Sequence, residues 1–341
     1  MTGCAAALRL AEAGQKVRLH EAREIAGGAS GRNGGFALRG GAAPFDVTAE
    51  AIGLENAVWL WRRTEQTLDR LEELAGDAFV RTGSLRLAAD EEERDELAVE
   101  LDALRATGFA AEWIDEPLGG RFRAAILHPP DAALQPARWV RRLAVCAAEA
   151  GVEIREHSRV DSLADVDAGQ VVVATDGYPS GLLGELEGLI VPTRGQMLAT
   201  EPVSERLFDL PHYGRHGFDY WQQRPDGRIL AGGFRDSALH EEFTTEETIT
   251  AAIQGALESF VADLVGRPLR VDYRWAGLFG LVMDFLPVVG RVPGEEDVWV
   301  AGGYSGHGNV LGLLCGELVA DAMLGHEVPE LALFAPARLL G

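Results

Sequence analysis

A glycine-rich segment near the N-terminus carries side chains suited to binding a phosphorylated ligand. Residues 27–35 read Gly-Gly-Ala-Ser-Gly-Arg-Asn-Gly-Gly, which places Ser30, Arg32 and Asn33 between glycines. Glycines let backbone amides approach a ligand closely, while the hydroxyl and the guanidinium can reach its phosphate oxygens. A flexible surface turn is the alternative, but a turn does not need Arg32 and Asn33. We therefore expect an anion-binding loop here.

The residues before this loop contain part of a dinucleotide-binding pattern. The full pattern is a strand, the sequence G-x-G-x-x-G, a helix, and an acidic residue about 20 positions further on. Gly3 matches the last glycine, residues 2–14 are expected to form the helix, and residues 16–20 the following strand. Glu21 ends that strand, where a carboxylate suits the paired hydroxyls of a ribose. The opening strand and first two glycines are not in the sequence, so this half-pattern is weak alone.

A second glycine-rich loop lies near the C-terminus, at residues 303–309. It reads Gly-Tyr-Ser-Gly-His-Gly-Asn, between an expected strand at 298–301 and an expected helix from Val310 to Leu324. A helix that starts in such a loop presents free N–H groups and the positive end of its dipole to a ligand. The imidazole of His307 could act as an acid or base, although its position between two glycines favours a backbone or packing role.

Residues in the middle of the chain are candidates for contacting a substrate. Tyr220 and Trp221 precede a hairpin turn at 225–227, where aromatic residues also commonly pack a sheet. Arg194 and Arg235 could each bind a carboxylate through two hydrogen bonds. Arginine supplies nearly all the positive charge of this chain, so ordinary ion pairing is the alternative for both.

The candidates for chemistry are therefore His307, Tyr220 and Arg235, and the catalytic residues stay open. No catalytic triad is recognisable. The three cysteines, Cys4, Cys146 and Cys315, are far apart and outside any CxxC pattern, so no metal site is expected.

Taken in order, these segments resemble the FAD-dependent oxidoreductases of the D-amino-acid oxidase and glycine oxidase superfamily, most of all the gamma-glutamylputrescine oxidase type. The resemblance covers nearly the whole chain. It is carried by Glu21-Ala22-Arg23, 28–35, 171–177, Arg194-Gly195-Gln196, 225–228 with Gly232-Gly233, Asp284, Pro287, Gly290 and 303–309.

The resemblance implies FAD as cofactor and a role for each segment. Glu21 would hold the adenosine ribose, and Ser30 and Arg32 would lie beside the pyrophosphate and ribityl chain. Residues 33–35 would pass near the isoalloxazine, and 303–309 would line its pyrimidine end, where helix N-terminal amides stabilise negative charge on reduced flavin. Val160 and Ala174 would frame the adenine side. The expected cofactor-binding residues are Gly3, Glu21, Ala22, Arg23, Ser30, Arg32, Asn33, Gly34, Gly35, Val160, Ala174, Thr175, Gly177, Gly303, Tyr304, Ser305, Gly306, His307, Gly308 and Asn309.

The alternation of short apolar runs with amphipathic helices predicts an α/β fold. We expect a Rossmann-like FAD-binding domain with an inserted antiparallel-sheet substrate domain. The first comprises residues 1–78, 137–190 and 274–341, and the second 79–136 and 191–273. The expected helices outside the loops cover 50–75, 91–107 and 137–150. The expected strands cover 83–88, 152–155, 171–174, 195–200 and 228–232, within a strand-and-turn region from about 190 to 275.

Three features depart from the family pattern. Without an opening strand, the strand at 16–20 would have an open edge in the middle of its sheet, which indicates an upstream start or a truncation that impairs FAD binding. The stretch 161–170 is too short for the small β-meander usual there. Lys16 is the only lysine and belongs to the adenine side, so no lysine is available beside the flavin to assist oxygen.

Charge and hydropathy limit the partners. The formal net charge of −22 argues against nucleic acid and against anionic membrane surfaces. No apolar run is long enough to span a bilayer and no signal segment follows Met1, so a cytoplasmic location is expected. The oligomeric state stays open.

The expected function is oxidation of a C–N bond in an amine or amino acid. The substrate would pass a hydride to flavin N5, the imine would hydrolyse, and oxygen or another acceptor would reoxidise the flavin. Such a reaction depends on positioning and electrostatics more than on acid–base groups. Two alternatives remain: a dehydrogenase of a hydroxy acid or alcohol on the same fold, and a truncated flavin-free pseudoenzyme acting as a binding module.

Overall fold

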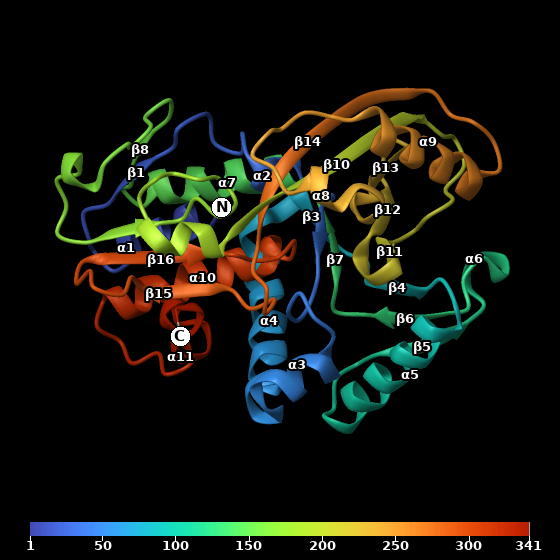
Figure 1. Ribbon diagram of the computed structural model, residues 1–341, viewed down its shortest axis with the longest axis horizontal. Helices are drawn as coiled ribbons and strands as arrows, with labels where there is room; N and C mark the ends of the chain where they lie inside the picture. The colour runs from blue at the N-terminus through green and yellow to red at the C-terminus, as the bar shows by residue number, and fades with distance from the viewer. Residues whose placement is uncertain (341) are drawn as a thin grey trace.

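Four sheets organise the computed structural model, which describes residues 1–340 (Figure 1). On one side, β1 (Arg18–His20) pairs in parallel with β8 (Glu153–Arg155). Near them lies a three-stranded sheet in the order β15 (Val288–Arg291), β16 (Val298–Gly302), β9 (Val171–Val173). No strand among residues 1–340 joins β1 to β9, so the open edge expected beside β1 is present.

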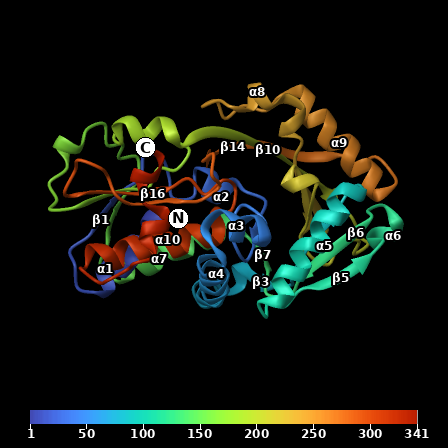
Figure 2. The same cartoon turned by 60° about the horizontal axis from the view of Figure 1, so that its bottom comes forward.

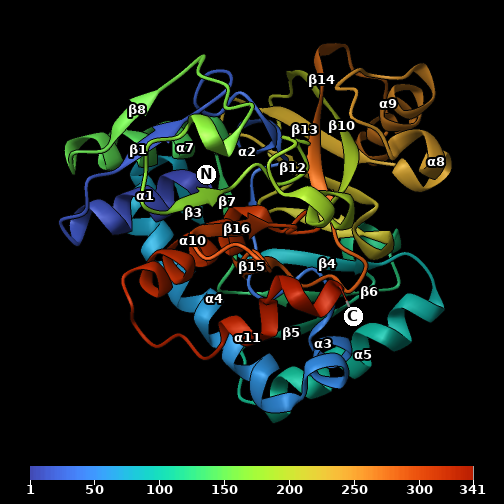
Figure 3. The same ribbon diagram turned by 60° about the vertical axis from the view of Figure 1, so that its left-hand side comes forward.

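Helices α1 (Thr2–Glu12), α7 (Pro136–Glu149) and α10 (Gly308–Met323) pack together beside β16 (Figure 3). The helix α10 is apolar on nearly all sides and is buried along most of its length, which fits a central position. Gly316 faces α1 so closely that a Cβ there would lie 2.8 Å from the Ala5 side chain. The two ends of the chain are therefore in close contact.

The other side of the molecule is an eight-stranded mixed sheet. Its order is β14 (Val271–Leu281), β10 (Val191–Pro202), β13 (Arg228–Gly233), β12 (Asp219–Gln223), β11 (His212–Gly214), β4 (Ser84–Ala88), β6 (Ala124–His128), β5 (Glu112–Asp115). All neighbours are antiparallel except β4 and β11. The helix α9 (Ala251–Val265) lies beside β10 and β14 (Figure 2) and buries its apolar stripe against one face of the sheet. On the opposite face, Tyr220 lies against Gly34 and Phe36.

A small sheet and a helix pair connect the two sides. The sheet has the order β2 (Phe36–Ala37), β7 (Ala132–Leu134), β3 (Phe79–Arg81). The prediction of a single helix over residues 50–75 is wrong, because the structure has two helices there, α3 (Phe45–Ile52) and α4 (Leu54–Ala75). Gly53 separates them, because its φ of 86° is incompatible with a continuing helix.

Two other regions differ from the expectation. The first glycine-rich loop contains the short helix α2 (Ala29–Arg32) and is followed directly by β2, and the predicted strand region includes α9. The strand β14 runs through the expected domain boundary at 273/274. The remaining helices are α5 (Glu91–Ala106), α6 (Pro117–Gly120), α8 (Leu239–Glu242) and α11 (Leu331–Phe334). No helix among residues 1–340 combines the length and apolar character needed to cross a bilayer.

Candidate cofactor and substrate site

A large hollow lies beside α1, between the β1–β8 pair and the sheet that contains β9. Its volume is about 1460 Å³, which exceeds the roughly 300–1,000 Å³ of ordinary small-molecule pockets. Eight of the expected cofactor residues line it: Gly3, Glu21, Ala22, Arg23, Ser30, Val160, Ala174 and Thr175. Residues from five separate segments therefore face one space.

Gly3 and Glu21 occupy positions that suit a nucleotide. A Cβ on Gly3 would lie 3.7 Å from Leu19 Cδ1 and 3.8 Å from Ala174 Cβ, which is ordinary van der Waals contact, so α1 begins beside β1 and the residue that follows β9. Glu21 directly follows β1, and its carboxylate accepts a hydrogen bond of 2.8 Å from the amide of Arg23. One carboxylate oxygen of Glu21 is left for a ligand.

Hydrogen bonds join the two glycine-rich loops. Asn33 Nδ2 donates to Asn309 Oδ1 at 3.2 Å, and Asn309 Nδ2 donates back to Asn33 Oδ1 at 2.9 Å. Asn309 also donates to the carbonyl of Phe36 at 2.8 Å, and the amide of Gly35 donates to Asn33. The residues expected near the flavin ring are thus brought together from both ends of the chain.

Asp176, which the sequence reasoning did not select, ties three segments together. Its carboxylate accepts hydrogen bonds from the amides of Gly280 at 3.0 Å and Gly303 at 2.7 Å. Burial raises the pKa of the Asp176 carboxyl, and these backbone donors partly offset the rise. The neighbouring Gly177 packs directly on the backbone of Phe279, where a side chain would not fit. The sequence Thr175-Asp176-Gly177 directly after a buried strand is the pattern from which this role of Asp176 could have been predicted.

Arg32, expected beside the pyrophosphate, and Arg23, another expected cofactor residue, both pair with one carboxylate. Glu247 lies 2.5 Å from Arg23 Nη1 and 3.3 Å from Arg32 Nη1, and it accepts a 2.5 Å hydrogen bond from the Tyr178 hydroxyl. Trp275 Nε1 donates to the carbonyl of Arg32 at 2.6 Å. Nothing in the sequence pattern indicates Glu247, because its role depends on contact between the two sides of the molecule.

Residues 1–322 match the family model described as DAO, FAD dependent oxidoreductase. The chain belongs to this family. This FAD-dependent oxidoreductase is 27% identical over 362 residues to the probable oxidoreductase OrdL of Haemophilus influenzae, covering 95% of this chain and 81% of the relative. It is 28% identical over 363 residues to the gamma-glutamylputrescine oxidoreductase of Escherichia coli, covering 95% and 82%. The resemblance inferred from the motifs, and FAD as cofactor, are confirmed.

Solved structures of similar fold support the architecture of the oxidoreductase. Glycine oxidase from Geobacillus kaustophilus superposes with a TM-score of 0.79 at 22% identity, covering 98% of this chain and 95% of that one. L-proline dehydrogenase from P. horikoshii gives 0.79 at 22% identity, covering 99% and 94%. At this identity the likeness establishes the fold alone, and it confirms the predicted fold class.

The residues of the oxidoreductase fit FAD in two respects that the structure supplies. Gly3, at the start of α1, lines the hollow, and α10 begins at Gly308 beside the first glycine-rich loop. Helix N-termini favour negative groups such as a pyrophosphate or a reduced ring. In the second loop, however, the Tyr304 hydroxyl pairs with Thr2 at 2.9 Å and the Ser305 hydroxyl accepts from the amide of Val282 at 3.1 Å. These two side chains are thus used within the protein.

The free face of the eight-stranded sheet turns toward the first glycine-rich loop. Strand register places Arg86, Tyr213, Tyr220 and Gly232 in one row across it. The Tyr220 ring lies against Gly34, and it meets the Phe36 ring edge-on with 5.8 Å between centroids. This row is the candidate substrate face.

Trp221 and Arg194 do not belong to that face. Trp221 points the other way, is fully buried and stacks on His212 with 5.0 Å between centroids. Arg194 forms a buried ion pair with Glu242, through bonds of 2.8 and 3.0 Å. The expectation that Arg194 could bind a ligand carboxylate is therefore wrong, because a protein carboxylate already holds it.

The three candidates for chemistry lie within electrostatic range of one another. The pKa of His307 is lowered to about 4, mainly by burial and also by the nearby charges of Arg86 and Arg235, while a hydrogen bond with the Ser305 backbone opposes the shift. Burial raises the pKa of Tyr220, while the positive charge of Arg235 opposes that rise. His307 Nδ1 is buried without a hydrogen-bond partner among the described residues. His307 is thus a neutral imidazole at neutral pH.

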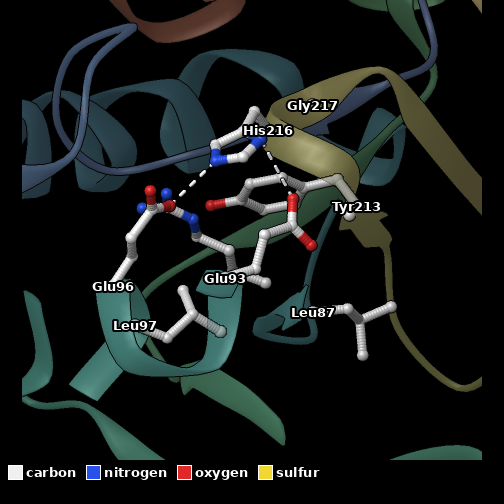
Figure 4. Close-up of a pocket in the computed structure, with 9 residues that line it drawn as sticks. Leu87, Glu93, Glu96, Leu97, Tyr213, His216 and Gly217 are labelled. Carbon is white, nitrogen blue, oxygen red and sulfur yellow. Dashed lines mark hydrogen bonds and ion pairs between the residues drawn. The ribbon is translucent and has the colours of Figure 1, made fainter. Parts of the chain in front are cut away.

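A small pocket at the end of this row shares Arg86 and Tyr213 with the substrate face. His216 sits there between two carboxylates, with Nδ1 3.1 Å from Glu93 and Nε2 2.8 Å from Glu96 (Figure 4). The space is about 10 Å³, which holds at most one water molecule. We interpret it as a structural contact between α5 and the turn after β11.

Proposed function

We propose that the protein oxidises a C–N bond of an amine or amino acid, with FAD held between the hollow beside α1 and the face of the eight-stranded sheet. The observation that carries this proposal is the convergence of Asn33 and Asn309 opposite Tyr220. Relatives named gamma-glutamylputrescine oxidoreductase and glycine oxidase support an amine or amino acid as the substrate. FAD, when bound, supplies the hydride acceptor.

The chain's own residues have defined tasks in this proposal. Glu21 accepts hydrogen bonds from the ribose, and the amides at the start of α10 stabilise negative charge at the ring end. The apolar packing of Phe36 and Tyr220 over Gly34 excludes water from the reacting face. His307, being neutral, adds no positive charge that would repel a substrate ammonium.

An absorbance and turnover experiment tests the function. Purified protein supplied with FAD should show flavin bands in the blue and near-ultraviolet, which should bleach when an amine or amino acid is added without oxygen. Bleaching by hydroxy acids or alcohols but not by amines would favour the dehydrogenase alternative. Protein that never acquires the bands would be a flavin-free binding module. Peroxide and dye reduction, measured in parallel, identify the acceptor.

A matched pair of variants tests the cofactor assignment. Glu21→Ala should weaken FAD binding about tenfold or more, because it removes a charge-assisted hydrogen bond to the ribose. Glu24→Ala is the control, since Glu24 is exposed on the same loop and makes only a 3.9 Å contact with His157. Equal FAD affinity in both variants would contradict the role of Glu21.

A further inference from the structure

One buried glutamine links the substrate face to the first glycine-rich loop. Gln222 lies two positions after Tyr220 on β12, so the two side chains are on the same face of the strand. The side chain of Gln222 is buried, and its Nε2 donates to the carbonyl of Gly34 and, at 3.2 Å, to that of Gly35. The eight-stranded sheet therefore holds two successive carbonyls of the loop that is expected beside the flavin ring.

The loop approaches this glutamine so closely that Gly35 cannot carry a side chain. The φ of Gly35 is 75°, and a Cβ there would lie 2.2 Å from the Leu134 carbonyl oxygen and 2.8 Å from Gln222 Nε2. The amide of Leu134 donates to the same Gly35 carbonyl at 2.8 Å. The loop is thus fixed between β7 and Gln222, and removing the donors of this side chain frees one of its two supports.

Gln222 is one end of a continuous chain of hydrogen bonds. The carbonyl of Gly34 and the amide of Gly35 belong to one peptide group, and that amide donates to Asn33 Oδ1 at 2.9 Å. Asn33 exchanges hydrogen bonds with Asn309, the second residue of α10. Hydrogen bonds linked in this way polarise and strengthen one another. The chain therefore runs from the substrate face through the first glycine-rich loop to the second.

The other contacts between the sheet and this loop lie at its helical part. Trp275 Nε1 on β14 donates to the carbonyl of Arg32 at 2.6 Å, and Arg32 Nη1 donates to the carbonyl of Ala276 at 3.3 Å. These bonds hold the end of α2. Within residues 1–340, no side chain of the eight-stranded sheet except Gln222 forms a hydrogen bond with residues 33–35. The segment expected beside the ring therefore depends on this one glutamine for its hold on the sheet.

We propose that Gln222 is a positioning residue that fixes the separation between the flavin ring and the substrate face. This inference rests on the proposed function, because it takes residues 33–35 to pass beside the ring. Hydride transfer needs the reacting atoms about 3–3.5 Å apart, and a displacement of about 1 Å can cost roughly 100-fold in rate. Tyr220 lies against Gly34, so loss of the Gln222 hydrogen bonds alters the spacing at the reacting face itself.

The neighbouring residue of the same strand offers a matched control. Gln222→Met keeps the length of the side chain and removes both donors. Gln223 is about as buried, and its amide also donates to two backbone carbonyls, those of Glu205 at 2.9 Å and Gly227 at 3.2 Å, in the connections before β11 and after β12. We expect Gln222→Met and Gln223→Met both to lower the melting temperature. Only Gln222→Met should shift the visible absorption bands of the FAD-supplied protein and speed FAD dissociation about tenfold.

Flavin reduction without oxygen separates positioning from substrate binding. The probe is whichever of glycine, alanine, proline and putrescine bleaches the wild-type flavin. Gln222→Met should lower the limiting rate of bleaching about 10- to 100-fold and change the half-saturating concentration of the probe less than about threefold. Gln222→His should recover part of the rate, because its Nε2 lies the same number of bonds from Cα and keeps one donor. Gln223→Met should bleach at the wild-type rate.

The outcomes distinguish this proposal from the proposed function. Wild-type bands and FAD dissociation in Gln222→Met, or equal effects in Gln222→Met and Gln223→Met, would overturn the role of Gln222. Should Gln222→Met fail to fold, Gln222→Asn shortens the amide by one methylene and should show the same changes to a smaller degree, and wild-type behaviour would again overturn the proposal. A wild type that never acquires flavin bands, or whose bands no amine bleaches, would count against the proposed function instead.

Discussion

Asn33 and Asn309 are 276 positions apart and donate to each other's side-chain oxygens, at 3.2 and 2.9 Å. Each belongs to a glycine-rich loop; Asn33 also accepts a hydrogen bond from the Gly35 amide, and Asn309 also donates to the carbonyl of Phe36 directly after the first loop. The pair therefore fixes the distance between the two loops that are proposed to hold the flavin ring.

Replacing either asparagine should remove both hydrogen bonds between the two loops, because each side chain is the partner of the other. We expect Asn33→Ala and Asn309→Ala each to lower the melting temperature and FAD affinity, with a coupling energy in the double variant of about 0.5–3 kcal/mol. Thermal unfolding and FAD titration of all four proteins measure it. Asn56→Ala is the control, because the Asn56 amide donates only to the carbonyl of Ile52 across the break between α3 and α4. Strictly additive effects would contradict the coupling.

Glu247→Gln should strengthen FAD binding. The change removes the negative charge beside Arg23 and Arg32 but keeps an acceptor for the Tyr178 hydroxyl. Phosphate groups then compete with a neutral amide, and we expect a few-fold lower Kd, about 1 kcal/mol. Glu258→Gln is the control, because it breaks the ion pair between Glu258 on α9 and Arg274 on β14. Weaker FAD binding would instead mean that Glu247 holds the arginines in their binding orientation.

His307 should make the protein less stable in acid. Its pKa is about 4 in the folded protein, against about 6.5 when unfolded. Its contribution is thus fully present above pH 6.5 and is lost as the pH falls toward 4. His307→Asn should remove about 1–3 kcal/mol of that pH dependence. Unfolding curves between pH 4 and 7 for wild type, His307→Asn and the exposed-site control His326→Asn test this, and identical slopes in all three would refute it.

Asp131 should have the opposite dependence. Burial raises its pKa from 3.8 to about 6, despite hydrogen bonds from Ser84 and the amide of Arg39. The stability contributed by its protonated form is fully present below pH 3.8 and is lost as the pH rises through 6. Asp131→Asn should therefore gain about 1–3 kcal/mol relative to wild type between pH 4 and 7. The exposed Asp77→Asn should show no such gain, and a variant less stable at pH 7 than at pH 4 relative to wild type would disprove the assignment.

The local sequence pattern was enough to predict an element where its apolar residues and the residues at its ends indicate the same structure. The strand at Val171–Val173 and the helix at Glu91–Ala106, which begins after the capping residue Asp90, are examples. The break at Gly53 was missed because apolar residues continue on both sides of it. The helix Ala251–Val265 carried a readable signal in Ile253, Leu257 and Val261, spaced four apart and buried, but the surrounding turns led to a prediction of strands.

Part of the candidate site was likewise predictable from the sequence, and part of it was not. The motifs indicated both glycine-rich loops, and the structure joins them through their asparagines. The sequence could not predict which of the three arginines Arg194, Arg32 and Arg235 form ion pairs within the protein. Each ion pair depends on whether the fold brings an acidic residue from a distant part of the chain next to the arginine. Glu242 pairs with Arg194 and Glu247 pairs with Arg32, whereas no acid among the described residues pairs with Arg235.

The contact between α1 and α10 has a consequence for how the enzyme is made. During translation the first glycine-rich loop, at residues 27–35, is synthesised long before residues 303–309. The proposed FAD site is therefore incomplete until the second loop has been synthesised and α10 has packed on α1, so we expect FAD to bind only after that point.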